Sequence, residues 1–344
     1  MTRFTFVLVL LSGLCGCAEV SYYYQAVEGQ MQIWNRSRPI AQVIGDTHTS
    51  PQVRERLSLV TRMRDFASSE LALPDNGSYR KYADLERPFV VWNIFAATEF
   101  SVAPKEWCFP IAGCVGYRGY FNQARAEQFG EALRSKGLDV FVTGIPAYST
   151  LGWFDDPVLN TVMRYPDAEL ARLIFHELAH QVVYIPGDTV FNESFAVAVE
   201  LEGVDRWLAR DGDPAKRTAF ELSEQRKGAF IELVMKYRAS LRELYASAVS
   251  EAQMRQKKAE TFAAMKVEYL TLKSSWGGFA GYDRFFSREL NNAHLVPVAT
   301  YSELVPGFRR VLAENGGDFK RFYAAVKEIG KLPKEQRQAK LKAD

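Results

Sequence analysis

The sequence predicts an α+β protein that is predominantly helical, and three observations support this prediction. Apolar runs of β-branched and aromatic residues over 88–100 and 138–144 predict a small mixed or antiparallel sheet. A periodic stretch over 166–204 predicts two helices joined by a short turn, and most of the remaining chain is charge-rich with helical spacing. We therefore expect residues 17–204 to form an α+β region that carries the candidate site. Residues 205–344 should form a helical subdomain that completes its cleft.

The first residues predict a secretion signal over residues 1–16. Arg3 precedes an apolar run from Phe4 to Leu14, which is too short for a comfortable membrane-spanning helix. The segment Leu14-Cys15-Gly16-Cys17 is similar to a bacterial lipobox, so we expect Cys17 to carry lipid and to begin the mature chain. An ordinary cleaved signal with two incidental cysteines is the alternative.

The sequence also predicts where the mature protein resides. Cys17 is not followed by aspartate, which in the bacterial sorting pattern favours the outer membrane. We expect a lipid-anchored protein of the bacterial cell envelope, on its periplasmic face. The composition is that of a globular chain, with 47% hydrophobic residues, 24% charged residues and a formal net charge of +2. Extended disorder and a nucleic-acid partner are therefore not expected, and the oligomeric state stays open.

Two cysteines, Cys108 and Cys114, follow the signal. In an oxidising compartment they would close a short loop as a disulfide. A metal pair is disfavoured because a spacing of six residues is unusual for zinc, and free buried thiols remain the alternative.

Several elements are expected before the candidate site. Residues 22–34 could begin a helix beside the main body, and Ser50-Pro51 predicts the start of a helix that runs through Ala67. The run over 88–100 is either one long strand or a strand pair. We expect a strand or turn over 116–121, an amphipathic helix over 122–136 that ends at Gly137, and a strand over 138–144.

A loop over residues 147–157 contains glycine, aromatic residues and two adjacent carboxylates. A well-packed surface loop is one interpretation. The other is that Tyr148 lines a substrate cleft, because loops on rigid scaffolds often carry function.

Two histidines and a glutamate indicate a metal site on the helix expected over residues 166–184. His176 and His180 are four residues apart, so both imidazoles lie on one helical face and can bind a single ion. Glu177 is rotated by about 100° from His176, which lets its carboxylate reach a metal-bound water as a general base. A coincidental pattern on a structural helix is the alternative.

The turn Ile185-Pro186-Gly187 should end this helix, and a second helix should begin at Asp188 or Thr189. Such a hairpin brings Glu193 back towards the histidines as a third ligand for one Zn²⁺ ion. Asn192 and Glu200 are expected to support the ligands from behind, although Glu200 could equally be a solvated charge.

The pattern His176-Glu177-Leu-Ala-His180 with Asn192-Glu193-Ser-Phe-Ala resembles the gluzincin zinc metallopeptidases. Together with the lipobox and the segments 107–114, 148–156 and 290–293, it is similar to a family of bacterial lipoproteins described as aminopeptidases. The resemblance implies hydrolysis of peptide substrates at zinc. The chain lacks the Gly-x-Met-Glu-Asn exopeptidase motif of the familiar gluzincin aminopeptidases, so N-terminal specificity is implied by the resemblance alone.

Beyond residue 204, charge-rich helices over 215–244 and 246–272 are expected to wall the site. Zinc peptidases of this kind use a downstream tyrosine or histidine to stabilise the oxyanion, and the candidates are Tyr282, His294 and Tyr301. Two other functions remain open: an inactive envelope lipoprotein that serves as a scaffold or binding module, and a hydrolase of a non-peptide envelope polymer.

Overall fold

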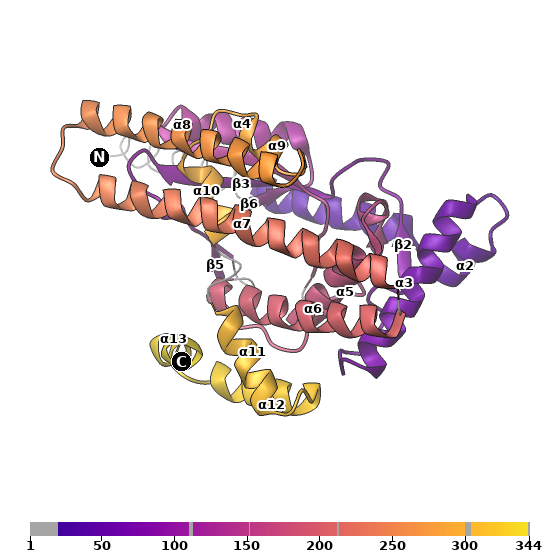
Figure 1. Cartoon of the computed structure of the whole chain (residues 1–344). Helices are drawn as coiled ribbons and strands as arrows, with labels where there is room; N and C mark the ends of the chain where they lie inside the picture. The colour runs from indigo at the N-terminus through magenta and orange to yellow at the C-terminus, as the bar shows by residue number, and fades with distance from the viewer. Residues whose placement is uncertain (1–19, 110–112, 151, 212, 300–303, 343–344) are drawn as a thin grey trace, which may run out of the picture.

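The structure is a computed structural model that describes residues 20–109, 113–150, 152–211, 213–299 and 304–342. Helices predominate and the strands are short, so the expected α+β, predominantly helical class is confirmed. Figure 1 shows a central helix pair with a long helical hairpin on one side and C-terminal helices on the other. These are α5 (Asp167–His180) with α6 (Thr189–Asp211), α7 (Pro214–Tyr245) with α8 (Glu251–Ser275), and α11 (Val305–Glu314), α12 (Phe319–Gly330) and α13 (Lys334–Lys342).

The central sheet is antiparallel and has the order β6-β3-β7. The run expected as one strand or two forms the single strand β3, which pairs along its whole length with β7. Alternate residues of a strand point to opposite faces. One face packs on α4 and forms a core, whereas the other face, which includes Val91, Asn93 and Phe95, is left to line a cavity. The elements are β3 (Val91–Thr98), β6 (Arg118–Tyr120), α4 (Gln123–Arg134) and β7 (Leu138–Ile145).

Smaller elements surround this sheet. The helix expected from Pro51 is α3, and Ser50 caps it by accepting a hydrogen bond from Val53 N. Two further β structures are a three-stranded sheet of order β1-β2-β8 and a β4–β5 hairpin. The smaller elements are β1 (Ser37–Pro39), α2 (Ile40–Gly45), α3 (Pro51–Ser69), β2 (Lys81–Ala83), β4 (Trp107–Phe109), β5 (Gly113–Val115), β8 (Val158–Leu159) and a 3₁₀ turn (Asn160–Val162).

The helix with the two histidines is shorter than expected. We expected it to reach Tyr184, but α5 ends at His180 because the next amides bond to carbonyls three residues back, Gln181 N to Leu178 O and Val182 N to Ala179 O. The chain then turns, and the Asn192 side chain closes the turn by bonding both N and O of Ile185 at 2.8 Å. The expected helix hairpin of α5 and α6 is thus formed by a tighter connection.

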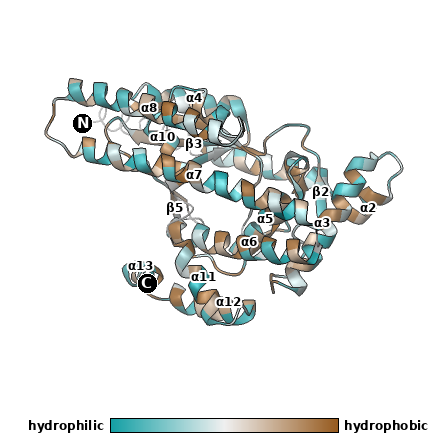
Figure 2. Cartoon of the chain, viewed as in Figure 1, coloured by the Kyte–Doolittle hydropathy of each residue, from teal (hydrophilic) through white to brown (hydrophobic). Residues whose placement is uncertain are grey.

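The α7–α8 hairpin has a core of its own. Its inner side chains include Phe230, Leu233 and Tyr269, and α9 (Asp283–Phe286) adds Phe286. Figure 2 shows hydrophilic and hydrophobic residues interspersed along both long helices, as expected for helices that pack on one side only.

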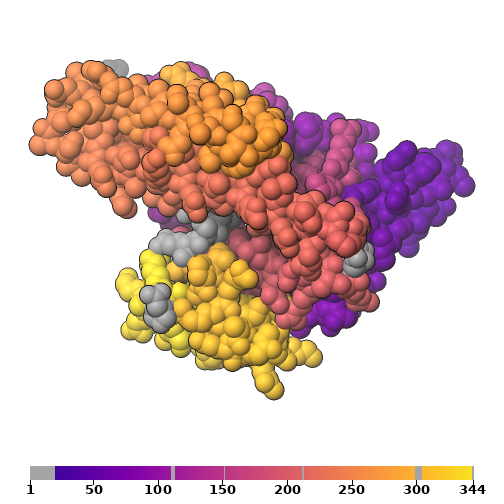
Figure 3. Space-filling view, in the orientation of Figure 1, coloured from indigo at the N-terminus to yellow at the C-terminus, as the bar shows by residue number. Residues whose placement is uncertain are grey.

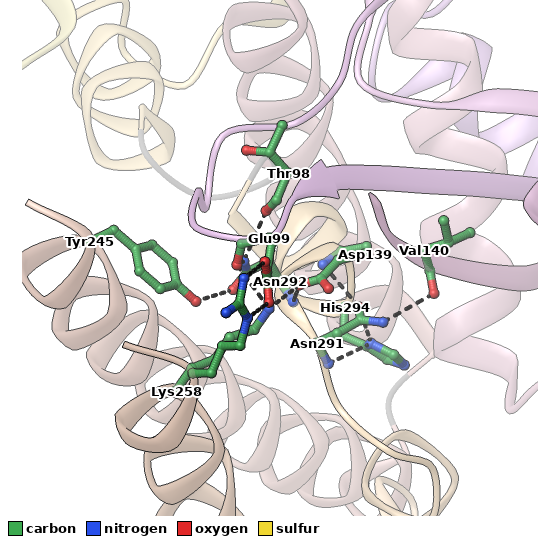
Figure 4. Close-up of polar contacts among 11 residues, drawn as sticks. Thr98, Glu99, Asp139, Val140, Tyr245, Lys258, Asn291, Asn292 and His294 are labelled. Atoms are coloured by element: carbon green, nitrogen blue, oxygen red, sulfur yellow. Dashed lines mark hydrogen bonds and ion pairs between the residues drawn. The ribbon is translucent and has the colours of Figure 1, made fainter. Parts of the chain in front are cut away.

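One polar cluster joins this hairpin to the end of the central sheet (Figure 4). Asn292, in α10 (Asn292–Ala299), donates through Nδ2 to Glu99 O at 2.9 Å and accepts at Oδ1 from Tyr245 OH at 2.8 Å. Lys258 of α8 bonds Asp139 at 2.6 Å and also the backbone oxygen of Glu99. The hairpin is therefore fixed to β3 and β7 at the edge where Thr98 pairs with Leu138.

The C-terminal helices belong to the main core. Phe308 of α11 and Phe322 of α12 pack on Phe195 of α6 within that core. On the face shown in Figure 3, these helices and the α7–α8 hairpin are separate projections on either side of α6. The boundary that we placed after residue 204 falls inside α6, because Val204, Trp207 and Leu208 continue its buried stripe.

A helix over residues 20–36 begins the described chain, which agrees with the helix considered for residues 22–34. It packs tightly on Phe121, the residue directly after β6, since a Cβ on Gly29 would stand 2.1 Å from the Phe121 ring. Gln25 Oε1 accepts a hydrogen bond from Phe121 N at 2.9 Å. Among the residues that the structure describes, no helix is both long enough and apolar enough to cross a membrane.

Candidate metal centre

Three side chains converge at the α5–α6 hairpin in an arrangement that could hold a metal ion: His176, His180 and Glu193. The two Nε2 atoms lie 3.1 Å apart. Glu193 Oε2 lies 3.3 Å from His176 Nε2 and 3.8 Å from His180 Nε2. The short turn after α5 is what places Glu193, in the first turns of α6, opposite both histidines.

These separations fit one ion. Ligand atoms of a tetrahedral site with bonds of about 2.0–2.2 Å stand about 3.3–3.6 Å apart, close to the observed spacings. Two imidazole nitrogens and one carboxylate oxygen are also the ligand chemistry of a catalytic zinc site, which keeps its fourth position open.

The protonation of the two histidines differs with their neighbours. Burial lowers the pKa of His180 to about 4, so its ring is neutral and can offer a lone pair. Burial also lowers the pKa of His176, but Glu200 and Glu193 outweigh this effect and raise it above the ordinary value. Buried Glu200 and half-buried Glu193 thus attract positive charge to this point, which a metal ion would satisfy as well as a proton.

Glu177 lies beside the ligands and faces the same cavity. Burial raises the pKa of its carboxyl to about 7, which Glu193 reinforces and His176 opposes. A carboxylate with a pKa near neutrality is suited to accept and then return a proton. Ser149 hydrogen-bonds this carboxyl from the 147–157 loop.

Glu200 is buried and contacts the ring nitrogen of His176 that faces away from the ligand cluster. Its Oε2 lies 2.6 Å from His176 Nδ1, and its Oε1 accepts from Arg172 Nε at 2.5 Å. Burial raises the pKa of Glu200, but Arg172 and His176 prevail and lower it to about 2. The carboxylate therefore stays ionised and directs Nε2 of His176 towards the ligand cluster, as expected for a supporting residue.

Arg172 extends this chain to the helical hairpin. Its Nη1 bonds Glu224 of α7 at 2.6 Å, and its guanidinium is almost fully buried. Neither Arg172 nor Glu224 could be selected from the sequence, because they are 52 residues apart and each is one charge among many.

We expect Glu200→Gln to weaken metal binding about 10–100-fold, since supporting residues of metal-ligating histidines contribute about that much. The amide can no longer accept from both Arg172 and His176 as an ionised carboxylate does. Metal affinity is measured by competition with a chromophoric chelator. The control is Glu202→Gln on the same helix, whose carboxylate pairs with Arg206. Equal affinity of Glu200→Gln and wild type would contradict this role.

A cavity of about 730 Å³ opens over the ligand cluster. The α5–α6 hairpin and its turn form one side of the cavity. The other walls come from the free face of the central sheet, the β4–β5 hairpin, the helix over residues 20–36, the described part of the 147–157 loop, and Pro297 of α10. The lining is mainly apolar and aromatic, and Glu177 and Glu193 are the carboxylates among its described residues.

The disulfide expected between Cys108 and Cys114 is present and closes the β4–β5 hairpin. Phe109 and Val115 of this hairpin line the cavity. The hairpin rests on the turn between α5 and α6, where a Cβ on Gly113 would stand 2.8 Å from Gly187 N. Gly113 also has a φ of +73°, so glycine is needed here for two reasons.

The 147–157 loop reaches the cavity, and Tyr148 lines it, which is the position predicted for that residue. Buried Asp156 holds the loop by accepting from Thr150 N at 2.8 Å and from Ser149 Oγ at 3.3 Å. Burial raises the pKa of Asp156 to about 6.

Among the other tyrosines that line the cavity, Tyr117 and Tyr184 are those whose hydroxyls are influenced by Glu193, and both were missed in the sequence. Burial raises the pKa of each hydroxyl, and Glu193 adds to the effect in both, so both hydroxyls remain protonated donors. Tyr184 could have been found from its position four residues after His180. For Tyr117 the sequence contains no comparable signal.

The predicted oxyanion residues are not brought to the cavity. Tyr282 stacks on Phe230 at 4.2 Å inside the hairpin core, and His294 stacks on Phe141 at 4.2 Å with Nδ1 against Asn291. Neither belongs to the described lining, because Tyr282 is used in the hairpin core and His294 in packing against β7, whereas α10 reaches the cavity through Pro297. Tyr301 and Cys17 lie outside the described residues. Asn192 lines the cavity, but its side-chain hydrogen bonds to Ile185 hold the turn rather than a ligand.

The fold and the site define a helical α+β protein with a His-His-Glu cluster beside the half-buried Glu177. The chain belongs to the family described as "Putative aminopeptidase", whose model matches residues 21–341. No curated protein and no solved structure matches the chain.

Proposed function

We propose that this protein is a zinc-dependent peptidase. The observation that carries the proposal is the convergence of His176, His180 and Glu193 beside half-buried Glu177 at the floor of a cavity of about 730 Å³. Membership of an aminopeptidase family supports peptides as the substrate class.

His176, His180 and Glu193 would hold one Zn²⁺ ion, which would supply a Lewis acid and would lower the pKa of a water molecule to about 7. Glu177 takes the proton of the attacking water and later delivers it to the leaving amine. Glu200 keeps His176 oriented throughout. A hydroxyl of Tyr117 or Tyr184 donates to the developing oxyanion, since both lie in the cavity near Glu193.

The position of cleavage within the peptide follows from how the substrate is held. A free α-ammonium group is best held by a carboxylate, and the described lining provides only Glu177 and Glu193, which the mechanism already uses. Cleavage at the N-terminus therefore rests on the family description.

Digestion of a synthetic peptide library, read by mass spectrometry, tests the proposal. The metal-loaded protein should cleave peptides, and the cut positions distinguish removal of single N-terminal residues from internal cleavage. No cleavage of any peptide, together with release of fragments from cell-wall polymer, would replace the proposal by a non-peptide hydrolase. No cleavage of either substrate would support a scaffold.

We also propose that the mature protein is anchored through lipid on Cys17 at the periplasmic face of the outer membrane. The lipobox-like segment 14–17 supports the anchor, and the Cys108–Cys114 disulfide fits an oxidising compartment. Metabolic labelling with a radioactive fatty acid should mark the wild type and leave Cys17→Ala unlabelled. Equal labelling would refute the assignment to Cys17.

A further inference from the structure

The helix over residues 20–36 exposes an apolar stripe along its outer face. Six large apolar side chains share this face, with exposed fractions between 41% for Trp34 and 69% for Val20. They recur every three or four residues and cover an arc of about 100° on an ideal helix. The stripe consists of Val20, Tyr23, Tyr24, Val27, Met31 and Trp34.

The remainder of the helix shows that this stripe is not needed for packing. A different face, with Gln25, Gly29 and Ile33, is buried against the protein. On the other border of the stripe, Glu28 and Gln32 are exposed and polar. The helix therefore has one face for the protein, a polar edge, and an apolar face directed outward.

The stripe continues onto the rim of the cavity. The Trp34 ring meets the Phe154 ring edge to face at 4.7 Å. Phe154 is 48% exposed and its neighbour Trp153 is 65% exposed, and both line the cavity. Tyr23 of the stripe lines it as well. The outward apolar surface thus borders the candidate metal centre.

The composition of this surface fits a lipid bilayer. Tryptophan and tyrosine favour the boundary between headgroups and acyl chains, and an amphipathic helix with an apolar stripe lies in the plane of that boundary. In the sequence, the helix starts three residues after Cys17, the expected site of lipid attachment.

We propose that the stripe and the adjoining Trp153–Phe154 rim form a membrane-docking surface that inserts into the interfacial region of a bilayer. The helix over residues 20–36 then lies along the membrane, and the mouth of the cavity opens beside the headgroups. Substrate reaches the metal centre along the membrane surface. The docking surface does not depend on catalysis, because none of its residues is a proposed ligand or base.

The test places an environment-sensitive fluorophore on single introduced cysteines of the mature, full protein bound to vesicles of phosphatidylethanolamine and phosphatidylglycerol. Val27→Cys reports on the stripe. Gln32→Cys, on the polar edge of the same helix, is the control for a fluorescence change that arises only because the helix lies close to the lipid anchor. Val267→Cys on α8 is the control for exposure, since Val267 is 65% exposed and Val27 is 59% exposed.

The label at position 27 should shift to shorter wavelength on vesicles and lose several-fold of its intensity when the lipids carry bromine on their acyl chains. Labels at positions 32 and 267 should keep the emission they have in water. An equal response at positions 27 and 32 would overturn the proposal. So would a shift at position 27 without vesicles that grows with protein concentration, because a second copy would then cover the stripe. The fluorescence response should be the same in Glu177→Gln protein, which is expected not to hydrolyse peptides. A negative result for membrane docking can therefore be distinguished from a negative result for hydrolysis.

Discussion

Glu177→Gln should lower peptide hydrolysis by about 10²–10⁴-fold, the usual contribution of a general base. Glutamine has nearly the same shape as glutamate but cannot take a proton from water at neutral pH. Bound metal should be unchanged, because Glu177 is not among the converging ligand atoms. The measurement pairs kcat on the best peptide of the library with metal content by mass spectrometry.

Glu221→Gln provides the matched control for this substitution. Glu221 is exposed on α7, so the same chemical change there should leave both turnover and metal content at the wild-type level. Substantial turnover by Glu177→Gln would transfer the role of base to another group. Loss of metal from that variant would instead make Glu177 a ligand.

Glu193→Ala should reduce bound metal from one ion per chain to a small fraction of that, and hydrolysis should fall with it. The variant removes the only carboxylate among the three converging ligands and leaves two imidazoles, which bind a metal ion far less tightly. Metal content after dialysis against a weak chelator, followed by addition of excess zinc, measures the loss.

The control for the ligand test is Glu202→Ala, nine residues further along the same helix and paired with Arg206. It should keep its metal and its activity. Unchanged metal stoichiometry in Glu193→Ala would show that the third ligand lies elsewhere in the chain. Circular dichroism of both variants separates loss of metal from loss of fold.

The parts of the site that are close in sequence could be predicted. Four-residue spacing placed His176 and His180 on one face, and the turn signal at Pro186-Gly187 implied a hairpin that returns Glu193 to them. Both inferences depend only on helix geometry and on a short connection. The geometry of Glu200 follows from the same hairpin, since it lies two turns beyond Glu193 on α6.

The parts that depend on long-range packing could not be predicted. Nothing local to Tyr117 or Glu224 reveals that one lines the cavity and the other bonds Arg172. The same limit explains Tyr282 and His294, which were selected for their chemistry and position after the ligands. Both side chains are used in packing the hairpin against itself and against β7.

The length of α7 links two distant parts of the molecule. Glu224, in the first half of this helix, bonds Arg172 on the metal-ligand side, and Tyr245, its last residue, bonds Asn292 at the end of the central sheet. These two points are separated by 21 residues, about 31 Å along a helix axis. A single helix therefore joins the support of His176 to the end of β3 and β7. A kink or a lost turn between the two points would prevent both bonds from forming at once, although no residue of α7 belongs to the described lining of the cavity.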